Sequence, residues 1–286
     1  MPLSPLDRVV YGPVRSRRLG ASLGVNLLPA GMKICNMDCA YCQYGWSRGL
    51  ARYRGQGSGW PTVEAVITAV AVRLEEAAEQ DEWIDRLTIA GHGEPTLHPK
   101  FDAIVAGLLQ VRDRLAPRLP VAVLSNSTTI LWPDVRRSLQ LLDERYMKLD
   151  AGDPIMFARL NGGRTPIRDV IDGLRTLSPV TVQSMFVRDP NHMLDNSTTA
   201  AVDRWLWALE AACAERVHIY TLDRRPALDL LEPVPARRLR EIAEQVRALG
   251  IPAEAFVAGA QSSRTTPQEA SGAAEGASDA RACDGG

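Results

Sequence analysis

Short apolar runs alternate with longer amphipathic stretches along most of this 286-residue chain, and this alternation constrains the fold more than any other feature. The short runs have strand length, and the longer stretches repeat apolar residues at helical spacing. Strand-like runs lie at 22–28, 86–90, 121–124, 146–149, 180–186 and 217–221, and helical stretches near 62–74, 101–108, 133–142, 167–177, 199–213 and 236–249. Repeated β–α units imply parallel strands with right-handed crossovers. About six units fit, which predicts an α/β fold, either a partial barrel or an open curved sheet, with its site at the carboxyl ends of the strands.

Three cysteines, Cys35, Cys39 and Cys42, form a CxxxCxxC motif after the first expected strand. With five cysteines in the whole chain, a chance triple at this spacing is expected in about one of several hundred such chains. Thiolates held this close are ligands for soft metals or iron–sulfur clusters. Three of them would leave one iron of a [4Fe-4S] cluster open, and an open iron could bind a substrate, as the open position of catalytic zinc does.

A structural zinc site is the alternative, and it would make the chain a non-catalytic metal-binding protein. Such a site needs a fourth ligand, and none of the four histidines, at positions 92, 98, 192 and 218, lies in the cysteine loop. A redox dithiol would leave the third cysteine without a role. Of the other cysteines, Cys213 lies in an Ala- and Trp-rich helical stretch and is expected in the core, and Cys283 is expected to be incidental.

The balance of charge limits the partners of the chain. Lysine and arginine total 33 against 34 acidic residues, and the net charge of −1 argues against binding to nucleic acid or membrane by bulk charge alone. Residues 1–60 nevertheless hold eight basic and two acidic residues. This local excess either attracts an anionic substrate, a nucleotide or RNA, or forms a solvated surface.

Residues 1–258 are expected to form one domain. Residues 259–286, rich in Ala, Ser and Gly, show no apolar periodicity and are expected to be a disordered tail. No apolar run reaches the roughly 18–20 residues of a membrane span, and the N-terminus lacks the apolar core of a signal peptide. The chain is therefore expected in the cytoplasm, with no membrane partner.

Motifs along residues 8–225 are similar to those of one enzyme family. The CxxxCxxC motif with Tyr41 just before its last cysteine resembles the radical S-adenosylmethionine (SAM) superfamily. The wider pattern is similar to a subgroup related to wyosine-biosynthesis (demethylwyosine synthase-like) tRNA-modifying enzymes. The segments that carry this second resemblance are YGPVRSRRLG at 11–20, SLGVN at 22–26, CAYCQYG at 39–45, GEPTLHP at 93–99, KLDAG at 148–152, QSMF at 183–186 and YTLDR at 220–224.

The resemblance implies an iron–sulfur oxidoreductase built as a partial (β/α)6 barrel, with a [4Fe-4S] cluster on Cys35, Cys39 and Cys42. The open iron would chelate the amino nitrogen and carboxylate of SAM. An electron from an external donor of the flavodoxin or ferredoxin type would split SAM into methionine and a 5′-deoxyadenosyl radical. That radical would abstract hydrogen from a substrate that the sequence does not identify, with tRNA as one candidate. The cofactor supplies the chemistry, and the protein supplies orientation and exclusion of water.

The resemblance also assigns SAM contacts to residues at the ends of the expected strands. Gly91 and Gly93 let the backbone approach the ligand, and Glu94 either pairs with the SAM ammonium or braces the loop. The further expected contacts are Ser125, Asn126, Asp150, Gln183 and Tyr41, with capping, barrel lining or packing as the alternative roles. Two lysines are also candidates for roles at the site.

Lys148 is a candidate amine nucleophile, because wyosine enzymes use pyruvate with a lysine. Lys33, two residues before the first cysteine, is expected to steady the anionic cluster or its loop.

Overall fold

The computed structural model describes residue 3 and residues 6–47, 49–177, 179–191 and 194–257. In this part of the chain nine strands form a sheet in the order β1-β2-β3-β4-β5-β6-β7-β9, with β8 paired to β6. Strands β2 to β7 run parallel to one another, and β9 continues this parallel ladder beyond β7. Strand β1 is antiparallel to β2, and β8 is antiparallel to β6. The strands are Val10–Ser16 (β1), Gly20–Val25 (β2), Arg86–Ile89 (β3), Val121–Ser125 (β4), Glu144–Lys148 (β5), Thr181–Arg188 (β6), Arg216–Thr221 (β7), Glu232–Pro233 (β8) and Ala253–Phe256 (β9).

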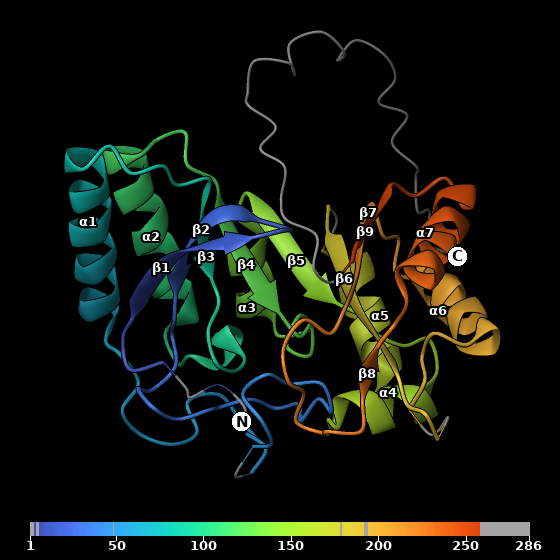
Figure 1. The fold of residues 1–286 in the computed structure, drawn as a ribbon. Helices are drawn as coiled ribbons and strands as arrows, with labels where there is room; N and C mark the ends of the chain where they lie inside the picture. The colour runs from blue at the N-terminus through green and yellow to red at the C-terminus, as the bar shows by residue number, and fades with distance from the viewer. Residues whose placement is uncertain (1–2, 4–5, 48, 178, 192–193, 258–286) are drawn as a thin grey trace, which may run out of the picture.

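The helices lie along the outer side of this curled sheet (Figure 1). They are Val63–Glu79 (α1), Phe101–Leu115 (α2), Pro133–Gln140 (α3), Pro154–Asn161 (α4), Ile167–Arg175 (α5), Thr199–Ala211 (α6) and Ala236–Ala248 (α7), with a short 3-10 turn at Pro95–Leu97. The result is a half-barrel of mostly parallel strands, so the predicted partial barrel is confirmed. No helix in the described ranges is long and apolar enough to cross a membrane.

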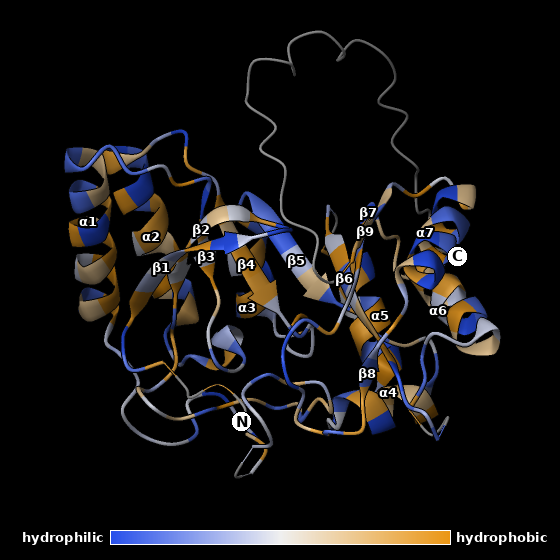
Figure 2. Ribbon diagram, in the orientation of Figure 1, coloured by the Kyte–Doolittle hydropathy of each residue, from blue (hydrophilic) through white to orange (hydrophobic). Residues whose placement is uncertain are grey.

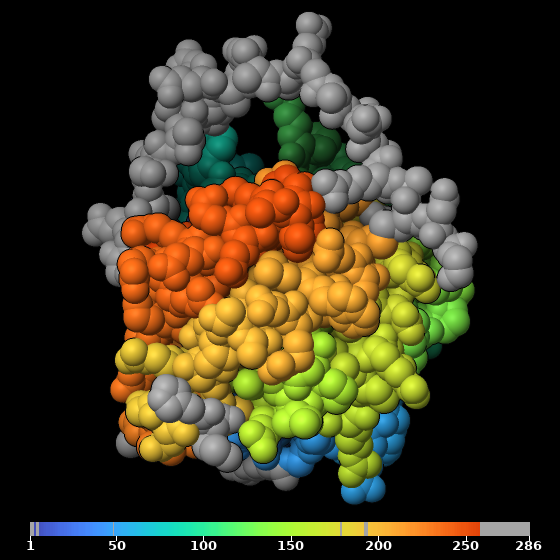
Figure 3. Space-filling view, turned by 90° about the vertical axis from the view of Figure 1, so that its right-hand side faces the viewer, coloured from blue at the N-terminus to red at the C-terminus, as the bar shows by residue number. Residues whose placement is uncertain are grey.

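Alternate residues of each strand face either the helices or the interior of the half-barrel. On β5, Met147 is fully buried in the main core, and so is Leu149 just after the strand. Tyr146 and Lys148 face the interior, where Lys148 approaches Tyr41 and Tyr220. Figure 2 shows apolar residues along the sides of the helices that meet the sheet, and Figure 3 shows α6 and α7 packed closely over one end of the molecule.

The expected elements are present, most with shifted ends. Thr62 caps α1 by accepting a hydrogen bond from the Ala65 amide at 3.1 Å. Cys213 is the main local difference, because it lies beyond the end of α6, partly buried, with a left-handed φ of 51°. Four elements were not expected, namely β1, α4, β8 and β9. The predicted tail at 259–286, including Cys283, lies outside the described residues.

Candidate functional site

The cysteine loop follows β2 and lies across the carboxyl ends of the neighbouring strands (Figure 1). The Glu94 amide, after β3, donates to Ile34 O at 3.0 Å. On the far side of the loop, the Asp38 amide donates to Asn161 O, at the end of α4, at 2.9 Å. The loop is therefore fixed at the edge where parallel α/β sheets place their sites.

Each thiol meets a different part of this edge. Cys35 Sγ accepts from Asn126 Nδ2 at 3.6 Å, Cys39 Sγ accepts from Asn161 Nδ2 at 3.5 Å, and Cys42 lies beside Lys33. Burial raises the pKa of Cys35 to about 12 and also raises the pKa of Cys39. Metal ligation requires thiolates, so loading of a metal cofactor must release these protons. In the described part of the chain, no three His, Cys, Asp or Glu side chains gather closely enough to hold a single metal ion.

Lys33 places a positive charge inside the cysteine loop. Its Nζ donates to Gly45 O at 2.5 Å and pairs with Asp38 Oδ1 at 3.3 Å, and its side chain is only 7% exposed. Burial disfavours the charged form, but Cys42, Cys35 and Asp38 outweigh it and raise the pKa of Lys33. The ammonium therefore stays charged and can offset the negative charge that thiolates would bring.

The two glycines of the loop after β3 allow a close approach of backbone segments. A Cβ at Gly93 would lie 1.9 Å from Ile34 O, and a Cβ at Gly91 would lie 2.1 Å from Asn26 Oδ1. Gly93 therefore needs to be glycine, because it packs directly against the backbone that leads to Cys35. At Gly91 the close neighbour is the Asn26 side chain, which an added Cβ would have to displace.

The Glu94 carboxylate is buried and accepts four hydrogen bonds. Its oxygens accept from the Thr96 amide at 3.2 Å, Thr96 Oγ1 at 2.6 Å, Ser125 Oγ at 2.9 Å and the Asn126 amide at 2.7 Å. Burial raises its pKa against the lowering effect of these donors. Three of these hydrogen bonds reach Oε1 and one reaches Oε2, so both oxygens are held by neighbouring residues. This arrangement favours bracing, since it ties the loop after β3 to the end of β4.

Asp150 joins the cysteine loop to β5, β6 and α4. Its Oδ2 accepts from Tyr41 Oη and from Asn161 Nδ2 at 2.7 Å, and its Oδ1 accepts from the Met185 amide at 2.8 Å. Lys148 Nζ lies 3.6 Å from Oδ2. Asn161, which the sequence analysis did not single out, thus contacts both Cys39 and Asp150.

Lys148 is a fixed cation within the half-barrel. Its Nζ donates to Tyr220 Oη at 3.3 Å and lies 5.0 Å from the ring centroid of Tyr41. Burial opposes its charge, but Asp150, Tyr220 and Cys39 more than compensate and raise its pKa. A protonated amine has no free lone pair, so these surroundings weigh against Lys148 as a nucleophile.

Several buried polar atoms of the described residues lack a hydrogen-bond partner. Among them are Asn161 Oδ1 and Ser127 Oγ near the carboxyl edge and Gln183 Nε2 deeper in the half-barrel. Gln183 lies level with Lys148 in the sheet, and its Oε1 accepts from Arg18 at 3.3 Å. Because buried polar groups are normally bonded, these atoms fit a site that takes a polar ligand. The three thiols beside them are suitable donors for an iron–sulfur cluster.

Four of the eight basic residues among the first 60 positions form ion pairs. These pairs are Arg8–Asp7, Arg17–Asp223, Lys33–Asp38 and Arg54–Asp134. Their charge is balanced within the chain, which reduces the positive field available to attract RNA.

Proteins of known sequence give the first comparison. A UPF0026 protein of Helicobacter pylori is 30% identical over 225 residues, which cover 76% of this chain and 67% of that protein. A protein named GTPase Obg from Brachyspira hyodysenteriae is 32% identical over 144 residues, 50% of this chain. The chain spans only 19% of the length of the latter relative.

Solved structures share the half-barrel. A radical SAM methyltransferase from Sphaerobacter thermophilus matches with a TM-score of 0.61 and 17% identity, over 82% of this chain and 66% of that chain. A structure of TYW1 with a lysine–pyruvate adduct bound matches with a TM-score of 0.57 and 16% identity, over 79% of this chain and 73% of that chain. At these identities the likeness establishes the fold alone.

The family model of the radical SAM superfamily matches residues 31–187, which include the three cysteines, Glu94, Asp150 and Gln183. This family uses a [4Fe-4S] cluster and SAM. Because the match covers more than half of the sequence and agrees with the half-barrel, the chain belongs to the radical SAM superfamily of enzymes.

Proposed function

We propose that the chain binds its [4Fe-4S] cluster through Cys35, Cys39 and Cys42, binds SAM at the open iron, and abstracts hydrogen from a substrate. The observation that carries this proposal is the arrangement of three separate thiols over the carboxyl edge, beside buried polar atoms without partners. When bound and reduced, the cluster supplies the electron that splits SAM into methionine and a 5′-deoxyadenosyl radical. This radical would then abstract a hydrogen atom from the substrate.

The surroundings of the sulfurs have a defined task in this proposal. Asn126 and Asn161 donate to Cys35 and Cys39, and hydrogen bonds to the sulfurs help to set the reduction potential of a cluster. Lys33 adds a buried positive charge near Cys42. Together these residues would hold the cysteine loop and lower the electrostatic cost of adding an electron.

We expect the SAM contacts at the same carboxyl edge of the sheet. Gly91 and Gly93 bring backbone close to the cysteine loop, and Asn126 with Ser125 lies at the end of β4. Glu94 acts on SAM indirectly, because it holds Ser125 and the Asn126 amide in place.

Tyr41 and Asp150 form the opposite wall, and their mutual hydrogen bond would orient the Tyr41 ring for stacking on adenine. Gln183 lies deeper in the half-barrel, with a free amide group available to SAM or to the substrate.

Anaerobic reconstitution with iron and sulfide tests the proposal. The wild-type chain should turn brown with about four irons per chain, and dithionite with SAM should release 5′-deoxyadenosine. Cys39→Ser should lose most of the iron and the product. Arg237→Gln is the control, because this α7 side chain is 90% exposed and far along the chain from the cysteine loop. A colourless protein with one zinc per chain would overturn the proposal in favour of a structural metal site.

The remaining components are an electron donor and a substrate. We infer an external donor of the flavodoxin or ferredoxin type, because the reaction consumes one electron and the described residues hold no second set of clustered cysteines. RNA is the candidate substrate supported by the wyosine-like motifs and by the structural likeness to TYW1.

A salt series tests the RNA candidate. Unmodified tRNA should be retained by the chain at about 50 mM salt and released steeply toward about 200 mM. If no retention occurs at any salt concentration, RNA is removed as a candidate. Comparing modified nucleosides of wild-type and deletion strains would then identify the position that is changed.

A further inference from the structure

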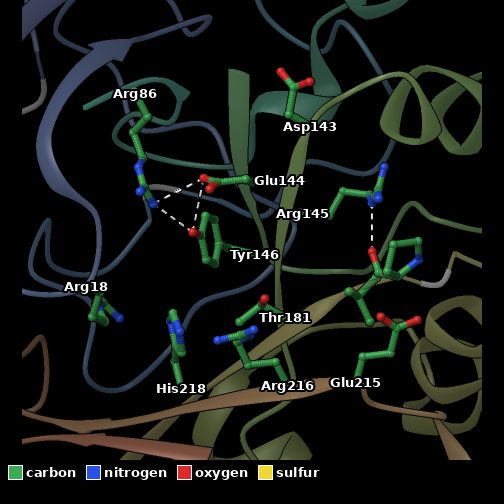
Figure 4. A pocket seen from close by; sticks show the side chains of 12 residues that line it. Arg18, Arg86, Asp143, Glu144, Arg145, Tyr146, Thr181, Glu215, Arg216 and His218 are labelled. Atoms are coloured by element: carbon green, nitrogen blue, oxygen red, sulfur yellow. Dashed lines mark hydrogen bonds and ion pairs between the residues drawn. The ribbon is translucent and has the colours of Figure 1, made fainter. Parts of the chain in front are cut away.

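A separate cavity opens at the opposite end of the half-barrel, where the strands begin (Figure 4). Its volume is about 490 Å³, within the usual range for small-molecule sites. Arg86, Thr181 and Arg216 line it from the first positions of β3, β6 and β7. Since a strand rises about 3.3 Å per residue, even His218, the third residue of β7, lies roughly 10 Å from the carboxyl end of that strand. It is therefore distinct from the cysteine loop.

Most charges that line the cavity are already compensated. Arg86 pairs with Glu144 at 3.1 Å, and Asp143 pairs with Arg112 at 2.7 Å. The Arg145 guanidinium donates to backbone carbonyls at the end of α3 and to Pro179 O. Glu215, the third carboxylate of the lining, acts with Asp143 to favour the charged form of Arg145. Carboxylates thus face both Arg86 and Arg145.

Two arginines at the cavity are not balanced by a carboxylate. Among the described residues, the Arg18 guanidinium contacts neutral groups, with Gln183 Oε1 at 3.3 Å and the Tyr220 ring centroid 3.9 Å from its Cζ. The Arg216 side chain has no hydrogen bond or ion pair with any other residue of the described part of the chain, and Arg216 is exposed at the mouth. The two guanidinium groups thus give the cavity two uncompensated positive charges.

His218 lies between these arginines, with its ring directed into the cavity (Figure 4). Its side chain packs beside Tyr146 and Phe256, with ring centroids 5.6 Å and 5.1 Å away. The residue is only 6% exposed, yet its Nδ1 has no hydrogen-bond partner. Buried ring nitrogens are normally hydrogen-bonded, so the imidazole keeps an unused polar atom.

The titration of His218 supports a positive potential in the cavity. Burial, followed by Arg18, Arg216 and Arg86, lowers the pKa of His218 to about 4. Repulsion by these arginines thus adds to burial in keeping the imidazole neutral.

We propose that this cavity binds a small phosphate-bearing molecule through Arg18, Arg216 and the imidazole of His218. Two uncompensated guanidinium groups match the charge of a phosphate dianion. Each planar guanidinium can donate a pair of hydrogen bonds to phosphate oxygens. A carboxylate would balance only one of the two charges. The site needs neither the cluster nor SAM, so its test is independent of the function proposed above.

Calorimetric titration of the full chain with sodium phosphate tests the site. Phosphate should bind saturably, and at least tenfold more tightly than acetate. Arg216→Gln and Arg18→Gln should each weaken phosphate binding at least tenfold. Arg216 is exposed, so its replacement should leave folding intact, which circular dichroism can check. Arg237→Gln, on the exposed face of α7, should bind like the wild type.

Nuclear magnetic resonance of the imidazole groups gives a second measurement. Phosphate should raise the pKa of the histidine whose signal disappears in His218→Gln, because a bound anion favours the imidazolium. Phosphate binding that is equally strong in Arg216→Gln, or absent from the wild type, would overturn the proposal. An unchanged His218 titration in saturating phosphate would overturn it as well.

Discussion

At the scale of single residues, buried charge controls the carboxyl edge of the half-barrel. The Asp150 side chain is fully buried and receives only donors, from Tyr41, Asn161, the Met185 amide and Lys148. Asp150→Asn would turn an amide group toward these donors and leave the Lys148 ammonium without its anion. Breaking a buried pair costs about 3–5 kcal/mol, so we expect the free energy of unfolding to fall by roughly 3 kcal/mol.

Urea denaturation of Asp150→Asn beside Asp229→Asn measures this loss. Asp229 pairs with Arg225 on the surface, and both side chains are more than half exposed, so its replacement should have little effect. Equal losses in the two variants would show that Asp150 does not act through a buried pair.

His218 makes stability depend on pH. Its pKa of about 4 in the folded chain lies below the ordinary value of 6.5, so the folded state binds fewer protons than the unfolded state between these values. The stabilisation is present above pH 6.5 and is lost as the pH falls toward 4. At 1.36 kcal/mol per pKa unit the loss is about 3 kcal/mol.

Unfolding free energies at pH 7 and pH 4 should therefore differ less in His218→Gln than in the wild type, by about that amount. Other groups titrate in both proteins, and the difference between the two chains removes their contribution. Parallel pH profiles of the wild type and the variant would contradict the effect of burial and the arginines on His218.

At the scale of elements, α4 is the support of the cysteine loop. It begins with Asp153, whose side chain caps the helix, and ends at Gly162 with a left-handed φ of 57°. The Asp38 and Ala40 amides donate to carbonyls of its last turn. This short helix thus determines where Cys39 lies.

Gly162→Ala should disturb this support. An added Cβ would lie 2.8 Å from Asp38 O, and alanine would be held at an unfavourable φ. We therefore expect the free energy of unfolding to fall by about 1–2 kcal/mol. We also expect fewer irons per chain after reconstitution. Gly31→Ala is the matched control, because Gly31 has a φ of 66° with no atom within 4 Å of its added Cβ. Equal iron content in both variants would show that α4 does not position the loop.

The elements also show what a sequence of this kind can reveal. The parallel strands and the longer helices were predictable because their apolar spacing extends over several turns or a full strand. The helix α4 has three consecutive apolar residues at 155–157, which hide the helical spacing that the equally short α3 shows with Val135 and Leu139. Capping signals are nevertheless present at its ends, in Asp153-Pro154 and Gly162. Strand β1 has a register shift between Tyr11 and Val14, which interrupts the alternation of a regular strand.

Some residues of the candidate site could likewise be predicted from the sequence, and others could not. Spacing predicted the three cysteines as ligands, and the family resemblance with the position after strands predicted Glu94 and Asp150 as site residues. Asn161 and Arg18 were not predictable, because their contacts with Cys39 and Gln183 join residues 122 and 165 positions apart. Such contacts depend on tertiary register and leave no local pattern.

At the scale of the whole molecule, the turn of the β1–β2 hairpin connects the first strands of the half-barrel to the last. Arg17 pairs with Asp223 after β7 at 3.0 Å and donates to Val257 O after β9. Beside it, Leu19 packs against Ala122 and Tyr146 in the interior. These contacts span the open side of the curled sheet, which the backbone ladder alone would leave unclosed.

Arg17→Ala should therefore loosen this closure without unfolding the sheet. The amides near the hairpin turn, where Ser16 pairs with Gly20, should exchange hydrogen faster, while amides of β4 should remain protected because that strand is central. Arg188→Ala is the control, since Arg188 pairs with Glu232 between β6 and β8 and does not bridge the open side. If exchange at the turn is equally fast in both variants, the closure rests on packing of Leu19 rather than on Arg17. In that case Leu19→Ala should reproduce the loosening.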